Sequence, residues 1–525
     1  MRRRDFLTSS LAGMTALTTP QIVRAQKATT ITFVPHADLA SFDPVWTTAD
    51  ITRNFSLAVY DTLYGYDAQF AAQPQMVEGH ETEDDGKEWT LRLRDGLKFH
   101  DGTPVLASDC VATIRRWGKR YPMGQALLAR TDELSAVSDK MIRFRLKRPF
   151  PLLPDALAEP YCSIMPERLA RTDPFDQIKE AMGSGPFKFV ASERVPGQRV
   201  VFEKNQDYVP RPTGKASFSA GPKLVHIDRV VWNFVQDPST ASAALAQGEV
   251  DWWENPAIDL IPQLRRNKDL VVTVKDRTGE IGCLRFNQLL PPFDNVAVRR
   301  VVLSAMDQRE VMTAVAGSEA SLIKTDVGLF VPGTPMASAV GVEITRGPKD
   351  LDKIKKELSA AGYKGERVVV LAASTIPVIY AEAQVATDVL QKIGMNIDLQ
   401  TLEWGSVVAR RASREPIDKG GWNIFYTYLG GMGNISPGPD IAIRASGLDA
   451  WFGWPTDPEM EALRDAWFDA LDLPAQQKIC RQMQEQFWQN PSYVPLGMFD
   501  QPTAFRSDLK DVRDGWPQFY GIRRI

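Results

Sequence analysis

The sequence contains little cysteine and little histidine, with four of each in 525 residues. The cysteines lie far apart without a CxxC pair, and a chain of this length needs no disulfide framework. The histidines form no HExxH or other paired spacing, so a zinc catalytic centre is not predicted. The eight positions are Cys110, Cys162, Cys283, Cys480, His36, His80, His100 and His226.

Motifs of catalysis and of cofactor binding are also missing. No serine lies in a GxSxG elbow. The glycines of "GSGPF" at 183–187 and those from Gly430 onward lack the Lys-Ser/Thr pair of a phosphate loop. Neither stretch continues as the strand–turn–helix fingerprint of a dinucleotide site. The sequence therefore predicts no enzyme, no cofactor and no metal site.

Long hydrophobic runs are absent as well, and no segment approaches the length of a membrane-spanning helix. The short apolar run from Leu11 to Leu17 follows the arginine pair of "RRRDFL" and precedes "VRAQ", with Val23 and Ala25 as small residues. This order is typical of a twin-arginine signal peptide, here residues 1–25. Since no cysteine lies near the cleavage site, we expect a soluble periplasmic protein without a lipid anchor.

Charge of one sign is not in large excess. The chain has 62 Lys+Arg and 65 Asp+Glu, a net charge of -3. Removal of residues 1–25 takes away four arginines and one aspartate, a net +3, and leaves -3 - 3 = -6. Such a surface gives no reason to expect a nucleic-acid partner. The chain is also longer than one hydrophobic core usually serves, so at least two lobes are expected.

Both helix and strand patterns are present. An apolar strand at 367–373 is followed by a helix that ends at Gly394 and by an alternating strand at 396–404. Strand, helix and strand of these lengths predict a parallel crossover, and so an α/β lobe. A first strand is predicted to begin at Thr30.

Five blocks carry a family resemblance: "LRLRDGLKFHDGTPVLASDCVATIRRW" (91–117), "GSGPFKF", "FEKNQDYVP", "AALAQGEVDW" and "FNQLLPPFDNVAVRRVVLSAMDQREVM". In this order, over nearly the whole chain, they resemble the bacterial extracellular solute-binding proteins of family 5. These are the dipeptide-, oligopeptide- and nickel-binding components of ABC importers. The blocks are mainly scaffold, because Ser108 or Asp109, and Asp294 or Asn295, are predicted to cap helices.

The resemblance implies an α/β fold, the two-lobe periplasmic binding protein of type II, in the large class with an extra subdomain. The chain is expected to cross between the lobes near Arg285-Phe286 and near Val494-Pro495. Such a hinge lets the lobes close on a ligand. The expected parts are lobe one at 28–73, 184–282 and 496–525, the extra subdomain at 74–183, and lobe two at 283–495.

The stretch "GGWNIFYTYLGGMGNISPGPD" from Gly420 carries most of the site that the resemblance implies. Its aromatic rings can present flat faces to a ligand, and its glycines expose backbone groups. Core packing stays open as the alternative for the aromatic residues. The predicted ligand-binding residues are Thr48, Asp50, Tyr121, Trp404, Arg410, Arg411, Trp422, Tyr426, Tyr428, Gly430 and Gly431.

One departure from the family affects the ligand. Peptide binders of the family carry an aspartate after this strand that pairs with the peptide's α-amino group, and 430–433 contain no carboxylate. An unpaired buried ammonium is costly, so ordinary dipeptides are expected to bind weakly. Asp50 is the expected substitute. Arg410 or Arg411 is expected to hold a ligand carboxylate, with an exposed helix charge as the alternative.

The predicted function is capture of a small organic solute for an ABC permease. A peptide-like ligand ranks first, then an organic acid or sugar, then a metal chelate. A periplasmic sensor or chaperone on the same fold stays as an alternative, and an exported hydrolase is the weakest one because no nucleophile–base pair is found. We expect a monomer whose partners are the ligand and the permease.

Overall fold

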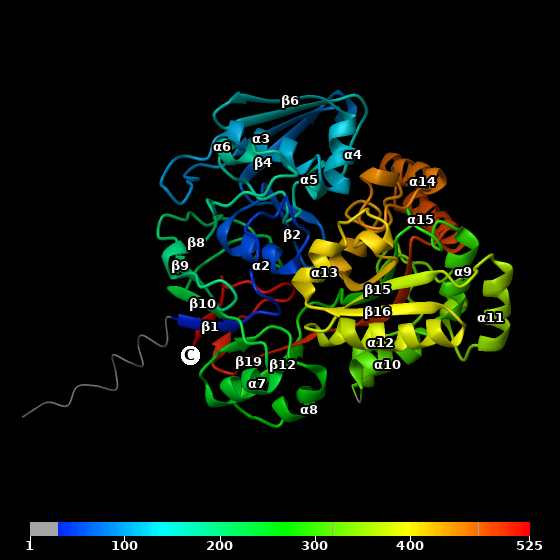
Figure 1. The fold of residues 1–525 in the computed structure, drawn as a ribbon. Coiled ribbons are helices and arrows are strands. Elements are labelled where there is room, and N and C mark those ends of the chain that lie inside the picture. The colour runs from blue at the N-terminus through cyan, green and yellow to red at the C-terminus, as the bar shows by residue number, and fades with distance from the viewer. Residues whose placement is uncertain (1–29, 318, 471) are drawn as a thin grey trace, which may run out of the picture.

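The computed structural model describes residues 30–317, 319–470 and 472–525. The expected signal peptide, residues 1–25, lies outside the described residues. Three sheets organise the described part of the chain, with seven, six and four strands. We call the parts built on them lobe one, lobe two and the subdomain. Figure 1 shows the subdomain above lobe one and lobe two beside them, which confirms the predicted two-lobe α/β architecture.

Lobe one is a mixed sheet around the first strand, which begins at Thr30 as predicted. This strand pairs in parallel with both of its neighbours, and the outer strands are antiparallel. In spatial order the strands are β12 (Leu270–Val274), β19 (Pro502–Arg506), β11 (Trp252–Trp253), β1 (Thr30–Val34), β10 (Arg229–Asn233), β9 (Arg199–Lys204) and β8 (Phe187–Phe189). The associated helices and hairpins are α2 (Asp50–Val59), α7 (Pro238–Gln247), α8 (Ile261–Leu264), β2 (Tyr64–Tyr66) with β3 (Ala72–Pro74), and β20 (Leu509–Lys510) with β21 (Arg523–Arg524).

Lobe two contains the predicted crossover. Its two strands pair in parallel, from Arg367 opposite Asn396 to Ala373 opposite Leu402, as the sequence predicts. In spatial order the strands are β14 (Ile323–Lys324), β18 (Tyr493–Phe499), β13 (Glu280–Phe286), β17 (Ile424–Gly430), β15 (Arg367–Ala373) and β16 (Asn396–Leu402). The helices are α9 (Val296–Ala305), α10 (Gln308–Ala316), α11 (Leu351–Ala360), α12 (Pro377–Lys392), α13 (Trp404–Arg410), α14 (Pro458–Asp469) and α15 (Leu473–Gln489).

The subdomain is an antiparallel sheet with short helices. Its strands are β4 (Val77–Glu83), β5 (Glu88–Leu93), β7 (Met141–Leu146) and β6 (Thr131–Ser138), and its helices are α3 (Ala107–Trp117), α4 (Pro122–Arg130), α5 (Leu153–Ala156) and α6 (Glu167–Ala170).

The two predicted helix caps differ in outcome. Asn295 caps α9, since its side chain accepts a hydrogen bond from the backbone N–H of Ala297 at 2.9 Å. The N-cap residue of α3 is Leu106 rather than Ser108 or Asp109, and Asp109 caps the helix from its third position. The Asp109 carboxylate lies in the first turn and accepts from the Leu106 N–H at 2.8 Å. A capping carboxylate three residues inside a helix looks the same in sequence as one at its start.

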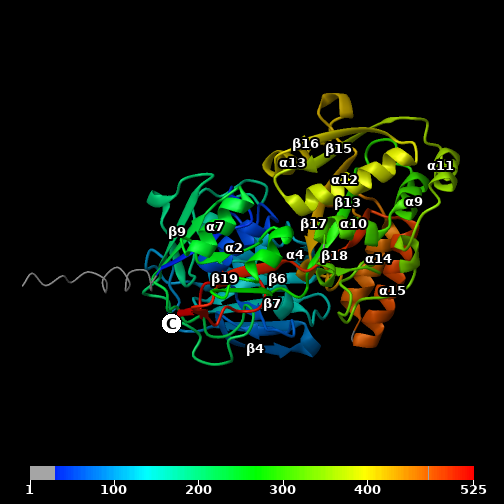
Figure 2. The same cartoon turned by 90° about the horizontal axis from the view of Figure 1, so that it is seen from below.

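The chain passes between the lobes at 275–279, between β12 and β13, and at 500–501, between β18 and β19. These crossings lie a few residues away from Arg285-Phe286 and Val494-Pro495, because β13 and β18 pair with each other inside lobe two. Gly279 has a φ of +64°, and a Cβ there would lie 2.7 Å from Asp500 Oδ1, so the crossings pack closely. Figure 2 shows the lobes side by side. None of the described helices is long and apolar enough to span a bilayer.

Candidate solute-binding site

A cavity of about 340 Å³ lies between the lobes, and lobe one, lobe two and the subdomain all contribute to its wall. Its volume falls in the range of small-molecule sites. From lobe one and the subdomain come three of the predicted residues, Thr48, Asp50 and Tyr121. Lobe two contributes four more, Trp404, Arg411, Tyr428 and Gly430.

Three other predicted residues lie elsewhere. Trp422 and Tyr426 are fully buried in the core, and the Tyr426 hydroxyl lies 3.3 Å from Thr387 Oγ1 on α12. Arg410 donates to the backbone oxygen of Gly420 at 3.0 Å and is not among the residues that line the cavity. The structure thus corrects their expected position, because β17 runs through the core and reaches the cavity only at its end. Core packing is what the structure shows for both aromatic residues.

Gly431 is the fourth predicted residue outside the cavity lining, and it packs on the first crossing instead. Its N–H donates to the backbone oxygen of Gly279 at 2.8 Å. A Cβ on Gly431 would lie 2.1 Å from the backbone oxygen of Thr278, so only glycine allows this approach. The glycine-rich loop therefore joins the cavity wall at Gly430 to the segment that links the lobes.

Arg411 presents a buried cation to the cavity. Its side chain is 5% exposed, and its guanidinium lies 4.8 Å from the Phe452 ring centroid and 5.4 Å from that of Trp404. Burial lowers its pKa to about 10. Among the described residues no carboxylate lies within 4.0 Å of it, and its Nε has no hydrogen-bond partner. A buried arginine without a counter-charge is unfavourable, so this site fits an anionic group of a ligand.

Around Gly430, two carboxyl groups and the Arg53 guanidinium lie close together. A Cβ on Gly430 would lie 3.7 Å from Glu280 Oε2 and 4.0 Å from Asp50 Oδ2. The Asp50 Oδ1 atom accepts from Arg53 Nη1 at 2.7 Å, and Glu280 Oε2 accepts no hydrogen bond from any residue that the structure describes. Burial and the neighbouring carboxylates, Asp50 first, raise the pKa of Glu280 well above its ordinary value. Two carboxyl groups from different lobes thus converge where the loop itself has none.

His36 also lines this end of the cavity. Its Nδ1 lies 2.8 Å from Glu254 Oε2, and Asn54 Nδ2 donates to the other oxygen of Glu254 at 2.6 Å. Burial opposes protonation of His36, but the Glu254 carboxylate outweighs it and raises the pKa of His36. The imidazole is therefore held in place by a carboxylate that is itself anchored on α2.

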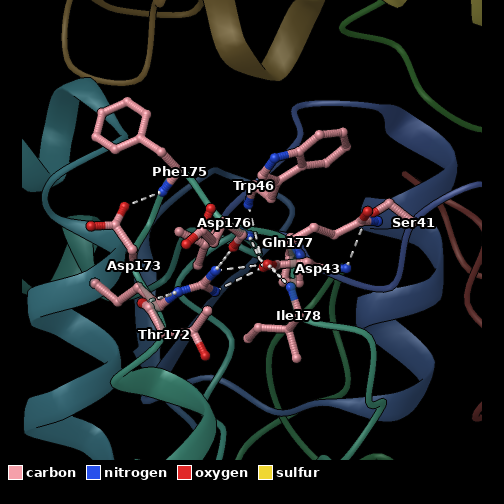
Figure 3. A network of polar contacts seen from close by, with 12 residues as sticks. Ser41, Asp43, Trp46, Thr172, Asp173, Phe175, Asp176, Gln177 and Ile178 are labelled. Carbon is pink, nitrogen blue, oxygen red and sulfur yellow. Dashed lines mark hydrogen bonds and ion pairs between the residues drawn. The ribbon is translucent and has the colours of Figure 1, made fainter.

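The loop before α2 is held by the buried carboxylate of Asp43 (Figure 3). Asp43 accepts from the backbone N–H of Val45 at 3.0 Å and of Ile178 at 2.9 Å. Arg116 on α3 donates to both carboxylate oxygens, at 2.9 and 2.7 Å, and this ion pair is fully buried. We call the loop before α2 the Thr48 loop, after the lining residue that it carries. Because Ile178 and Arg116 belong to the subdomain, their contacts with Asp43 hold the Thr48 loop against the subdomain.

Tyr121 acts on the same loop. Its hydroxyl donates to the backbone oxygen of Pro44 at 2.7 Å and lies 3.1 Å from that of Thr47. Its ring stacks on Tyr161 with centroids 4.7 Å apart and an interplanar angle of 16°. Tyr121 therefore shapes the cavity by supporting the loop and by placing an aromatic stack in the wall.

Several lining residues are not found by sequence reasoning. The most notable are charged or aromatic side chains that come from loops and short helices without a motif: His36, Asp155, Glu159, Asp440 and Trp451. Asp440 lies in the "GPD" of the quoted stretch, and this was its one sequence signal. The others become neighbours only through the packing of three separate sheets.

Comparison with known proteins agrees with this architecture. The family model described as bacterial extracellular solute-binding proteins, family 5 Middle, matches residues 71–447. A probable peptide ABC transporter periplasmic-binding protein, y4tO, of Sinorhizobium fredii is 37% identical over 515 residues, 97% of this chain and 96% of that protein. The glutathione-binding protein GsiB of Pectobacterium atrosepticum is 23% identical, over 92% of this chain and 91% of its own.

Two solved structures show the same fold. The binding protein DppA of Helicobacter pylori in complex with the peptide STSA has a TM-score of 0.79 at 21% identity, covering 96% of this chain and 99% of its own. AgaA of A. tumefacien R10 with agropinic acid has a TM-score of 0.78 at 22% identity, covering 94% and 99%. The chain belongs to family 5 of the bacterial extracellular solute-binding proteins and is a solute-binding protein rather than an enzyme.

Proposed function

We propose that this protein captures a peptide-like solute between its lobes and delivers it to the permease of an ABC importer. The 37% identical relative is named as a probable peptide transporter component, which supports this ligand class. The observation that carries the proposal is Arg411, a buried cation that lines the cavity without a counter-charge. A solute carboxylate supplies that charge.

The ligand lies across the cavity in this proposal. Its carboxylate pairs with Arg411, and its apolar part rests on Trp404 and Tyr428. Its amino group lies near Gly430, where Asp50 and Glu280 approach. Each hydrogen bond to a charged group contributes about 1.5–3 kcal/mol. Micromolar affinity corresponds to about -8 kcal/mol, so a few such contacts with the aromatic faces suffice.

We expect the mature protein in the periplasm after export by the twin-arginine route and cleavage after Ala25. The support is the sequence pattern of residues 1–25 and the periplasmic relative. Replacing Arg3 and Arg4 with lysine tests the route, since export that is unchanged in this variant would exclude it.

The ligand assignment is tested with adjacent arginines. Isothermal calorimetry would screen dipeptides, tripeptides and aromatic or aliphatic carboxylates, and the solutes that bind are then measured with Arg411→Met and Arg410→Met. We expect Arg411→Met to weaken binding by roughly 10- to 100-fold, because the charge is lost while the apolar stem remains. Arg410→Met is the matched control, since Arg410 contacts backbone outside the cavity. Equal effects of the two variants, or no binding of any carboxylate, would refute the assignment.

A further inference from the structure

The wall that the subdomain gives to the cavity contains two carboxyl groups without a basic partner. Asp155 on α5 and Glu159, four residues later, both line the cavity. Glu159 is 5% exposed, and neither of its oxygens makes a hydrogen bond to a described residue. In the described part of the chain, no lysine, arginine or histidine nitrogen lies within 4.0 Å of either group. Buried carboxyl groups normally have such partners, so this pair is unusual.

Aromatic rings surround these carboxyl groups. Tyr66, Tyr121 and Tyr161 line the same part of the cavity, and the last two are stacked. The Tyr66 hydroxyl donates to the backbone oxygen of Asp155 at 2.8 Å and holds the turn that carries it. The faces of aromatic rings attract organic cations, and the attraction is larger where water is excluded. Carboxyl groups beside tyrosine faces suit an ammonium or guanidinium group.

The charges of the whole lining leave these two groups uncompensated. Arg53 is paired with Asp50, and His36 is paired with Glu254. Arg411 belongs to lobe two and awaits an anion, as described above. The titratable acids and bases of the lining other than tyrosine are Asp50, Asp155, Glu159, Asp440, Arg53, Arg411 and His36.

The ligand-free state of this wall is only partly charged. Burial raises the pKa of Glu159 to about 8, against the opposing effect of the nearby Trp117 indole, which does not reach hydrogen-bond geometry. Burial also raises the pKa of Asp155 to about 6. The remaining titratable groups that interact with Glu159 are Tyr66, Tyr121, Tyr161 and Cys162, and Tyr161 also interacts with Arg53. A cation that enters here favours the ionised carboxylates and displaces a proton.

We propose that Asp155 and Glu159 form a subsite for an organic cation, so that the solute is peptide-like with a basic side chain. Asp155, which is partly exposed, contacts the cation, and the more deeply buried Glu159 supplies further negative charge behind it. This inference rests on the proposed function, because it places the basic group of a solute whose carboxylate is held by Arg411. It adds a charge requirement that a plain dipeptide does not meet.

Two small ions of equal length test the subsite without knowledge of the natural solute. Pentylammonium chloride and sodium pentanoate are titrated separately against the ligand-free protein at about pH 7.5, with sodium chloride as the ionic-strength reference. A ligand that binds the folded state raises the melting temperature. We expect pentylammonium to stabilise the wild type, and Glu159→Gln and Asp155→Asn each to raise its half-saturating concentration at least tenfold. Glu81→Gln removes an exposed carboxylate from β4 of the same subdomain and should change nothing.

Proton release gives a second readout. Calorimetry of pentylammonium in buffers of different ionisation enthalpy should show protons released by the wild type and none by Glu159→Gln. No stabilisation of the wild type by pentylammonium, or equal stabilisation of Glu159→Gln, would overturn the subsite. The pentanoate titration separates the two proposals: if Arg411→Met abolishes its binding while pentylammonium fails, the carboxylate site stands and only the cation subsite falls.

Discussion

At the scale of single residues, buried carboxyl groups make the stability of this protein depend on pH. Asp440 lines the cavity and accepts from the backbone N–H of Ala442 at 2.8 Å, but its Oδ2 has no hydrogen-bond partner in the part of the chain that the structure describes. Burial raises its pKa to about 7, and that of Glu159 to about 8. On α12, Glu382 is fully buried, neither of its oxygens has a hydrogen-bond partner among the described residues, and burial raises its pKa well above the ordinary range. The folded protein therefore favours the protonated form of all three.

These shifts predict that the ligand-free protein is less stable in alkaline solution. The folded pKa values lie above the ordinary values of 3.8 for Asp440 and 4.5 for Glu159. The stabilisation is therefore fully present below those ordinary values and is lost as pH rises through about 7 and 8. We expect the free energy of unfolding in urea to fall from about pH 5 to about pH 9, by about 4 kcal/mol through Glu159 and about 3 kcal/mol through Asp440. Glu159→Gln should flatten this slope, and a slope equal to that of the wild type would contradict the assignment.

At the scale of elements, the spacing of apolar residues predicted the helices and strands whose buried face is set by their own sequence. The β15–α12–β16 unit followed from apolar residues at strand and helix spacing, since each element buries a face that its own sequence defines. The site was predicted only in part, at the residues next to a family motif, such as Trp404 and Arg411. Glu159 gave no signal, because its exposure depends on the packing of α3, α5 and the β2 region against it. Trp422 and Tyr426 were misplaced because an aromatic strand looks alike in a core and at a cavity.

The buried Asp43–Arg116 ion pair links the loop before α2 to α3, so we expect its loss to destabilise both. Asp43→Asn leaves the buried Arg116 guanidinium without its counter-charge and weakens the hold on the Thr48 loop. We expect the free energy of unfolding to fall by about 3–5 kcal/mol, measured by urea denaturation. Solute affinity should also drop, because the loop forms part of the cavity wall.

The control for this variant lies nearby on the same network. Asp173 is exposed, and its side chain accepts from the backbone N–H of Phe175 at 2.8 Å (Figure 3). Asp173→Asn should cost about 1 kcal/mol or less. Equal costs for the two variants would show that the buried pair does not stabilise the fold as argued.

At the scale of the whole molecule, the loop that lines the cavity also contacts the segments that link the lobes. The glycine-rich loop contacts the cavity at Gly430 and the first crossing through Gly431, and Gly279 packs against Asp500 in the second crossing. In the proposed function, a solute contacts both Asp50 of lobe one and Arg411 of lobe two, and it makes both contacts only when the lobes approach each other. Without it, the Asp50 carboxylate of lobe one and the Glu280 carboxyl group of lobe two both approach Gly430, and burial and Asp50 raise the pKa of Glu280.

We therefore predict that the protein is more open without solute. Small-angle scattering should give a smaller radius of gyration at saturating solute than in its absence, because differential contacts shift the population to the closed form. The same pair of curves for Arg411→Met should show little change at a solute concentration that saturates the wild type. Identical curves for the wild type, with binding shown by calorimetry, would argue against lobe closure.

The four thiols of the chain have a consequence for its maturation. Cys110, Cys162, Cys283 and Cys480 are all free and buried, and burial raises the pKa of each. Thiols in this state are poor nucleophiles and slow to oxidise. The four thiols therefore need no oxidant to reach their final state, in a reducing compartment as readily as outside it. A protein that is proposed to cross the inner membrane already folded has no disulfide bond to form in the periplasm.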